Sequence, residues 1–136
     1  MTNNAYYLVK ISTDGVTGLF KTKKTPELQQ LYDLIGCDLV ESLRIDNDVL
    51  MLVDESGRLK DEPVPNFKAS LLYSGTPHSI VGNAVLLKLD RRACDWKALS
   101  YDEAVGLLIE IEARAEAYIQ DELMQILKGK GKQHDY

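Results

Sequence analysis

Residues 54–87 read DESGRLKDEPVPNFKASLLYSGTPHSIVGNAVLL, and this stretch decides the fold. It follows a nearly continuous apolar run at 48–53, which predicts a buried strand. Gly57 accepts a positive φ without steric cost, so it indicates a chain reversal after that strand. Pro63 and Pro65 cannot donate hydrogen bonds to a β-ladder, and they predict a surface connection.

The second half of the stretch predicts a short helix and another strand. Asn66 stands at the start of the helix, where its side-chain oxygen can accept a hydrogen bond from an amide of the first turn. Gly75 ends this helix, and a strongly apolar strand follows at 84–89. The whole unit is therefore strand, turn, proline-containing loop, short helix, loop and strand.

The residues before this unit predict a hairpin, a helix and a second hairpin. Two runs of β-type residues lie on either side of the turn signal at Gly15. Thr25 suits the N-cap of the helix, Pro26 its first position and Gly36 its end. A strand at 38–45 then turns back into the apolar run that precedes residue 54.

The residues after the unit predict a linker and one long helix. The segment 90–96 is expected to form a linker or a short helical turn, with Trp96 packed under the last helix. Ser100 and Glu103 form a capping box that opens a helix at 101–128. One face of this helix is apolar, with Ala104, Leu108, Ile111, Ala115, Ile119, Leu123 and Ile126.

This helix would be about 40 Å long, which is roughly the width of a domain of this size. Its second half is therefore expected to overhang the sheet, and its apolar stripe then needs a cover. A second copy of the same helix is the simplest cover and predicts a homodimer. The alternative is a broken or bent helix that packs entirely on its own domain. If the helix serves only association, a chain ending after Lys97 should remain a soluble monomer.

Together these elements predict an α+β fold with a mixed or mainly antiparallel sheet of about five strands, helices on one face and a long C-terminal helix. A chain of 136 residues can fold in this way without disulfides or metal ions. The expected organisation is an α+β core at 1–89, a linker and long helix at 90–128 that packs on the core or a partner, and a disordered tail at 129–136.

Composition excludes several classes of protein. The net charge of −5 and the pI of about 5.0 argue against direct nucleic-acid binding, which needs clustered basic residues. No apolar run approaches the roughly 20 residues of a membrane span, and no signal peptide is recognisable. Cys37 and Cys94 fit no zinc or redox spacing. We therefore expect a cytoplasmic protein that does not act at a membrane.

No catalytic signature, metal spacing or phosphate loop stands out, so the sequence predicts no cofactor and favours a protein that is not an enzyme. Acidic residues lie at the two ends of one predicted strand, namely Asp46, Asp48, Asp54 and Glu55. Their spacing does not match an EF-hand, and turn formation explains them. The alternative is a small hydrolase, with or without a metal, that uses Asp54, Glu55 and His78. It requires these side chains to converge in a cleft.

The central stretch also resembles a known family. The pattern is DExGxL at 54–59, a proline followed by Asn66 and Ala69, and IxGxAxL at 80–86. In this order it resembles an uncharacterised family of small proteins that is common in phages, conjugative elements and gut bacteria. That family is known only as a domain of unknown function. The resemblance covers about residues 5–89 and implies an intracellular protein in a phage or mobile-element context.

These observations predict a non-enzymatic accessory or binding protein of a phage or mobile element, and one specific version of this hypothesis is a protein that counteracts a host defence. Its ligand would be a host protein or a small nucleotide. A structural assembly protein acting through the C-terminal helix is a further alternative. A ligand site is expected where the loops of the central stretch meet, and its polar candidates are Arg58, Asn66, Lys68, Tyr73 and His78.

Overall fold

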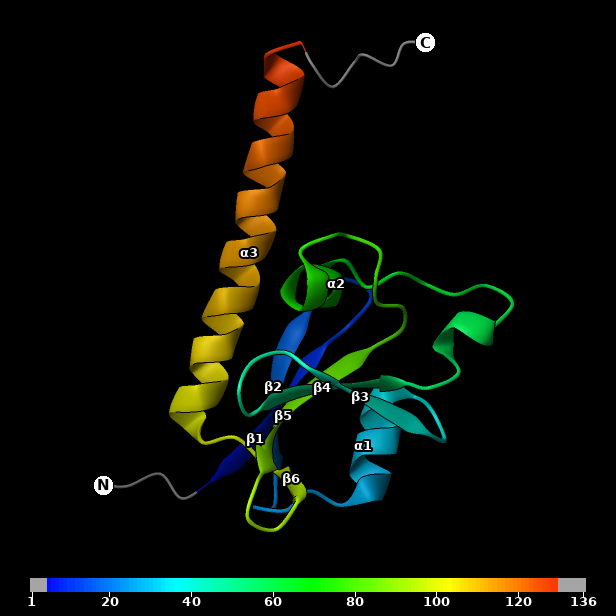
Figure 1. The fold of residues 1–136 in the computed structure, drawn as a ribbon, viewed down its shortest axis with the longest axis vertical. Coiled ribbons are helices and arrows are strands. Elements are labelled where there is room, and N and C mark those ends of the chain that lie inside the picture. The colour runs from blue at the N-terminus through cyan, green and yellow to red at the C-terminus, as the bar shows by residue number, and fades with distance from the viewer. Residues whose placement is uncertain (1–4, 130–136) are drawn as a thin grey trace.

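The computed structural model describes residues 5–129 and contains an open antiparallel sheet flanked by helices (Figure 1). The strands are β1 (Tyr6–Ile11), β2 (Thr17–Thr22), β3 (Val40–Arg44), β4 (Val49–Asp54), β5 (Ala84–Asp90) and β6 (Asp95–Lys97). The helices are α1 (Leu28–Ile35), α2 (Phe67–Ser74) and α3 (Tyr101–Leu127), with a 3₁₀ turn at Gly57–Leu59. The predicted α+β class is confirmed.

The central strand of the sheet is β5, and its first residues are the end of the stretch 54–87 that decides the fold. The strand order is β2-β1-β5-β4-β3, and β6 pairs with the end of β5. Leu86 of β5 pairs with both Val9 of β1 and Met51 of β4, and both pairings are antiparallel. The two predicted hairpins, β1 with β2 and β3 with β4, are confirmed.

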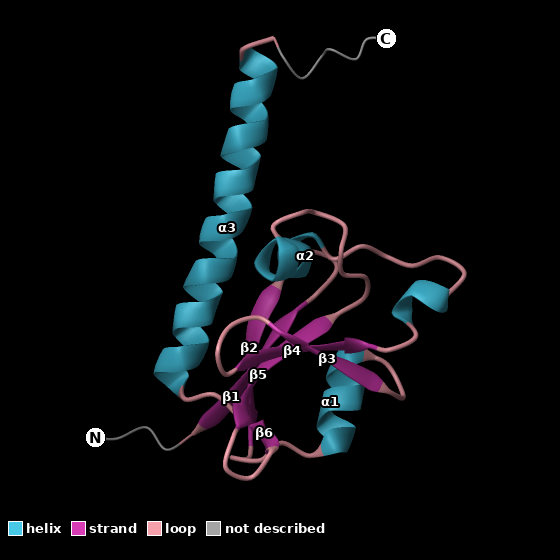
Figure 2. Cartoon of the chain, viewed as in Figure 1, coloured by secondary structure: helices cyan, strands magenta, loops and turns pink. Residues whose placement is uncertain are grey.

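Helices cover both faces of the sheet, so the expectation of helices on one face is wrong (Figure 2). On one face α1 packs on a cluster formed by Leu8, Leu31, Ile35, Leu50, Leu52, Val85 and Leu87. On the other face α2 and α3 pack on a cluster that includes Val9, Ile11, Met51, Leu72, Leu86, Leu99, Ala104 and Ile111. Successive residues of β4 and β5 alternate between the two clusters, which explains why both strands are apolar without interruption.

The caps predicted for the second and third helices are confirmed. The side-chain oxygen of Asn66 accepts a hydrogen bond from the N–H of Ala69 at 3.1 Å, at the start of α2. At the start of α3, the N–H of Glu103 donates to the Ser100 hydroxyl at 3.1 Å, and the Glu103 carboxylate accepts from the N–H of Ser100 at 2.8 Å. Both motifs satisfy amides that a helix leaves unpaired at its N-terminus.

The first helix starts later than predicted. The prediction placed the N-cap at Thr25, whereas α1 begins at Leu28 with Glu27 at the N-cap and no side-chain cap. Pro26 is buried just before the helix, and the backbone of Glu27 is extended, with φ −77° and ψ 140°. The predicted end is confirmed, because Gly36 has a φ of 82° and its N–H donates to a carbonyl of the last turn.

The segment after β5 forms a turn at 91–94, which leads into a short strand that the sequence did not predict. Asp90 accepts hydrogen bonds from the backbone N–H groups of Arg92 and Ala93, and the turn returns the chain as β6. Trp96 of β6 pairs with Leu89 and packs on the cluster that α1 covers. The expectation that Trp96 lies under the last helix is therefore wrong. The strand β6 was missed because three residues carry too little sequence signal to be recognised as a strand.

The last helix, α3, starts on the core and ends beyond it (Figure 1). Ala104, Ile111 and Ala115 are its buried residues. Every residue of 119–127 is exposed. The predicted overhang is therefore confirmed, and the alternative of a broken helix packed entirely on its own domain is wrong, since α3 is continuous from Tyr101 to Leu127.

The tail expected at 129–136 lies outside the described residues except for Gly129. Within residues 5–129, no helix combines the length and the apolar character that a membrane span needs.

Candidate functional site

The 3₁₀ turn after β4 is hydrogen-bonded to the loop that follows α2, and both lie in the stretch 54–87 that decides the fold. The 3₁₀ turn projects Arg58 toward the loop that follows α2, where its guanidinium donates hydrogen bonds to the backbone carbonyls of His78 and Ser79. The preceding Gly57 is buried, and a Cβ on it would lie 3.1 Å from a methyl group of Val81. The guanidinium of Arg58 is therefore held in place by backbone carbonyls of its own chain, and some of its N–H donors are already used in these hydrogen bonds.

Asn66 is completely buried and connects three segments of the chain. Besides capping α2, its side-chain amide donates hydrogen bonds to the carbonyls of Ile11 and Gly82, each at 2.9 Å. Its backbone N–H donates to the carbonyl of Ile80 at 2.8 Å. The amide thus holds the end of β1 and the approach to β5 against α2, and its hydrogen-bonding groups are turned inward.

Lys68 lies on the side of α2 that faces α3. Its Nζ is 2.8 Å and 2.9 Å from the two carboxylate oxygens of Glu112, and it also donates to the carbonyl of Gly15 at 2.8 Å. Next to it, the rings of Phe67 and Tyr118 meet edge to face with their centres 5.7 Å apart. These contacts fix α2 against α3 and give the Lys68 charge a partner within the chain.

A cavity of about 240 Å³ brings Arg58 and Tyr73 together. Its remaining lining residues are Glu41, Leu43, Val53, Asp54, Glu55, Ser79, Ile80 and Val81. Of the five predicted ligand-binding residues, Arg58 and Tyr73 line this cavity, whereas Asn66, Lys68 and His78 do not. Three carboxylates share the cavity with one guanidinium, so its charge favours a neutral or cationic ligand over a phosphate.

Of the three residues named for the hydrolase alternative, two line the same cavity and the third does not. Asp54 is largely buried, with 8% of its side chain exposed, and pairs with the Lys60 ammonium at 3.0 Å. Asp54 and Glu55 both line the Arg58 cavity, whereas the exposed His78 does not. Within residues 5–129, no group of three or more His, Cys, Asp or Glu residues is placed to hold a metal ion.

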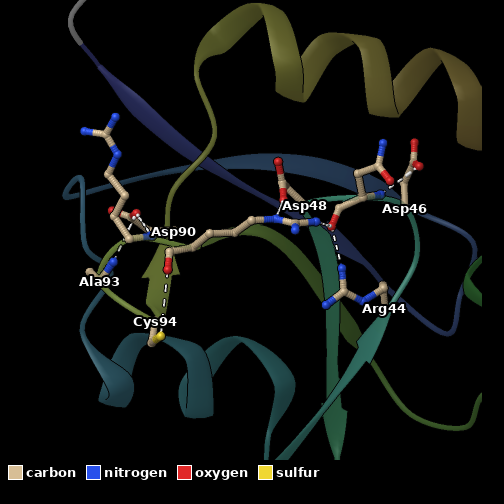
Figure 3. A network of polar contacts seen from close by, with 9 residues as sticks. Arg44, Asp46, Asp48, Asp90, Ala93 and Cys94 are labelled. Carbon is tan, nitrogen blue, oxygen red and sulfur yellow. Dashed lines mark hydrogen bonds and ion pairs between the residues drawn. The ribbon is translucent and has the colours of Figure 1, made fainter.

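The acidic turn between β3 and β4 takes part in a polar network that joins it to the turn before β6 (Figure 3). The Nε of Arg91 lies 2.5 Å from a carboxylate oxygen of Asp48, and its Nη2 donates to the carbonyl of Asn47 at 3.1 Å. Arg44 donates to the same carbonyl at 2.6 Å. The hydrogen bond from Arg91 holds the pKa of Asp48 below its ordinary value. These contacts give Asp48 a structural role that joins two hairpins.

No sequence signal pointed to a larger cleft beside α1, whose volume is about 620 Å³. It is lined by Gln29, Tyr32, Asp33, Gly36, Cys37, Asp38, Leu39, Asp54, Ser56 and Lys60. Burial raises the pKa of the Cys37 thiol, and the neighbouring negative charge of Asp54 raises it further. The thiol is therefore protonated near neutral pH and is not activated as a nucleophile.

The overhanging part of α3 exposes several large apolar side chains. Large side chains that are 47% to 79% exposed follow one another along it, namely Ile119, Leu123, Met124, Ile126 and Leu127. They continue the stripe whose first half packs on the sheet. A contiguous apolar surface on a rigid helix is typical of a protein–protein contact.

Comparison with known proteins identifies the family and leaves the activity open. No curated protein and no solved structure matches this chain. A family profile matches residues 7–114, which takes in all of the sheet except the first residue of β1, together with the first half of α3. The match extends beyond residue 89, where the resemblance was expected to end. The chain belongs to the family described as domain of unknown function DUF3846.

Proposed function

We propose that this protein is a non-enzymatic accessory protein that works as a homodimer assembled through α3. The observation that carries the proposal is the exposed apolar segment at 119–127. It projects beyond its own sheet, so it can contact another chain without any rearrangement of the fold (Figure 1). Covering such a surface removes apolar area from water, which is the main driving force of protein association.

The dimer would serve a phage or mobile element inside the cytoplasm by binding a host protein. The context is supported by the resemblance of the 54–87 stretch to proteins of phages and conjugative elements. Blocking a host defence protein is better supported than capturing a nucleotide signal. The reason is that the Arg58 guanidinium is already bonded to two backbone carbonyls and shares its cavity with three carboxylates, which repel phosphate.

The test is the oligomeric state of the purified full chain, measured by native mass spectrometry and light scattering. Wild type should be a dimer at micromolar concentration. The double variant Leu123→Gln with Leu127→Gln should be a monomer with an unchanged circular dichroism spectrum, since both side chains are exposed in the single chain. Leu59→Gln is the matched control, because Leu59 is 84% exposed and lies outside α3. A monomeric wild type would refute the proposal.

A small polar ligand bound beside Arg58 is a second candidate function, favoured by the 240 Å³ cavity that Arg58 and Tyr73 share. Native mass spectrometry of protein purified gently from its producing cells would show such a ligand as added mass.

A further inference from the structure

A second pattern runs along α3 on a side that does not pack on the core. Its members recur at alternating steps of four and three residues, and they are Ile109, Ala113, Glu116, Gln120, Leu123 and Leu127. All six are exposed. This alternation of steps is the spacing of a coiled-coil seam. We call these six residues the outer seam.

The outer seam is apolar at both ends and polar in the middle. Ile109 is 65% exposed at one end, and Leu127 is 79% exposed at the other. Between them, Glu116 and Gln120 make no hydrogen bond or ion pair with any residue of the described range 5–129. The order apolar, polar, apolar is the same from either end, so the seam can match a reversed copy of itself.

We propose that the outer seam binds the outer seam of a second copy of this chain in antiparallel orientation, with Ile109 opposite the partner's Leu127. This inference rests on the proposed homodimer and specifies its geometry. In this register Ala113 lies opposite the partner's Leu123, and Glu116 opposite the partner's Gln120. Two-fold symmetry makes each contact occur twice.

The polar middle of the seam selects the antiparallel orientation. In that orientation the side-chain amide of Gln120 donates a hydrogen bond to the carboxylate of the partner's Glu116, and both groups gain a partner in the second copy. In a parallel pair, Glu116 would face the partner's Glu116, and like charges in a seam repel each other. A single polar layer of this kind is a known determinant of orientation and register in coiled coils.

The surface beside the seam has room for the partner's overhang. A shallow groove of about 600 Å³ follows the first half of α3 and is lined by Thr17, Leu108, Ile109, Glu112, Ala113 and Glu116. In the proposed register the partner's Leu123 and Leu127 enter this groove. Glu112, the charged residue beside it, is already held by Lys68 and by the hydroxyl of Thr17. The charge of Glu112 is therefore already compensated, and the groove carries less net negative charge than its number of acidic residues suggests.

Cysteine cross-linking of the full chain tests the register. In a background of Cys37→Ala and Cys94→Ser, the variants Ile109→Cys and Leu127→Cys are purified separately, mixed and oxidised. The mixture should give a disulfide-linked dimer joined between positions 109 and 127, and each variant alone should give little. Asp121→Cys replaces Leu127→Cys in the matched control, because Asp121 is exposed on α3 but lies outside the seam.

The outcomes separate this inference from the proposed homodimer. Efficient linking of Leu127→Cys to itself would indicate a parallel pair and overturn the register. A dimer in native mass spectrometry without any 109–127 link would also overturn it, while the proposed homodimer would stand. A monomer under all conditions would refute both.

Discussion

The ammonium of Lys68 lies 2.8 Å from a carboxylate oxygen of Glu112, and this ion pair joins the short helix of the fold-deciding stretch to the long helix α3. Glu112 also accepts a hydrogen bond from the hydroxyl of Thr17 at 3.2 Å. Three segments that are far apart in the sequence therefore meet at one carboxylate. A lysine that looked free for a ligand has a structural partner instead.

We expect the Lys68–Glu112 pair to contribute modestly to stability. A double-mutant cycle with Lys68→Met and Glu112→Gln, measured by urea unfolding, should give a coupling free energy below about 1 kcal/mol. The reason is that half of the Glu112 side chain is exposed, so solvent screens the pair. Lys23→Met with Glu27→Gln provides a matched, more exposed pair for comparison. A coupling of several kcal/mol would contradict this interpretation.

Asn66→Ala should be far more costly. It removes the cap of α2 and takes the Asn66 donor away from the buried carbonyl of Ile11 and the partly buried carbonyl of Gly82. A cap contributes about 1 kcal/mol and each buried hydrogen bond a similar amount, so we expect a loss of about 3 kcal/mol in the free energy of unfolding. Asn47→Ala, at an exposed turn position, is the control and should change it by less than about 0.5 kcal/mol. A loss below 1 kcal/mol at Asn66 would show that the buried amide is dispensable.

Arg58→Ala tests the second candidate function. Arg58 bridges two loops at the edge of the fold, so its loss should leave the core intact and alter only the 240 Å³ cavity. If a ligand occupies that cavity, the mass added to wild-type protein in native mass spectrometry should be absent from the variant. Lys68→Met, outside the cavity, should retain it. Equal added mass on wild type and Arg58→Ala would place the ligand elsewhere.

The local parts of this fold were predictable from sequence, and the reason is visible at Asn66 and Ser100. A cap depends on residues three positions apart, so its signal is contained in the sequence pattern. The hairpins and the overhang of α3 follow from similarly local periodicity. Helices on both faces were missed because an apolar run such as that of β4 shows that a strand is buried, but not which element covers each face.

The candidate site was less predictable, because burial and pairing of polar residues depend on distant segments. Asn66 binds Ile11, 55 residues away, and Lys68 binds Glu112, 44 residues away. Neither partner could be inferred from the residues around them. Arg58 and Tyr73 come together in one cavity, whereas the cleft beside α1 forms from segments that showed no common sequence signal.

The Asp48–Arg91 pair predicts a specific pH dependence. Because the pKa of Asp48 is lower in the folded chain than its ordinary value of 3.8, the unfolded chain binds the proton more tightly. The pair therefore stabilises the fold above pH 3.8 and loses this effect as the pH falls through the lower, folded pKa. The difference in unfolding free energy between wild type and Asp48→Asn should be largest near neutral pH and vanish in acid. In an Arg91→Met background the same comparison should show a much weaker trend, because the main partner of Asp48 is then absent.

Two truncations of α3 distinguish the role of its first half from the role of its second half. A chain that ends after Lys97 lacks Leu99, Ala104 and Ile111, which belong to the core cluster shared with the sheet. Contrary to the expectation of a soluble monomer, we expect it to lose cooperative unfolding. A chain that ends after Gln120 keeps every buried residue of the helix and should remain folded but monomeric. Circular dichroism and native mass spectrometry distinguish these states. A soluble, cooperatively unfolding 1–97 fragment would show that the first half of α3 is not needed for the core and that the helix serves association alone.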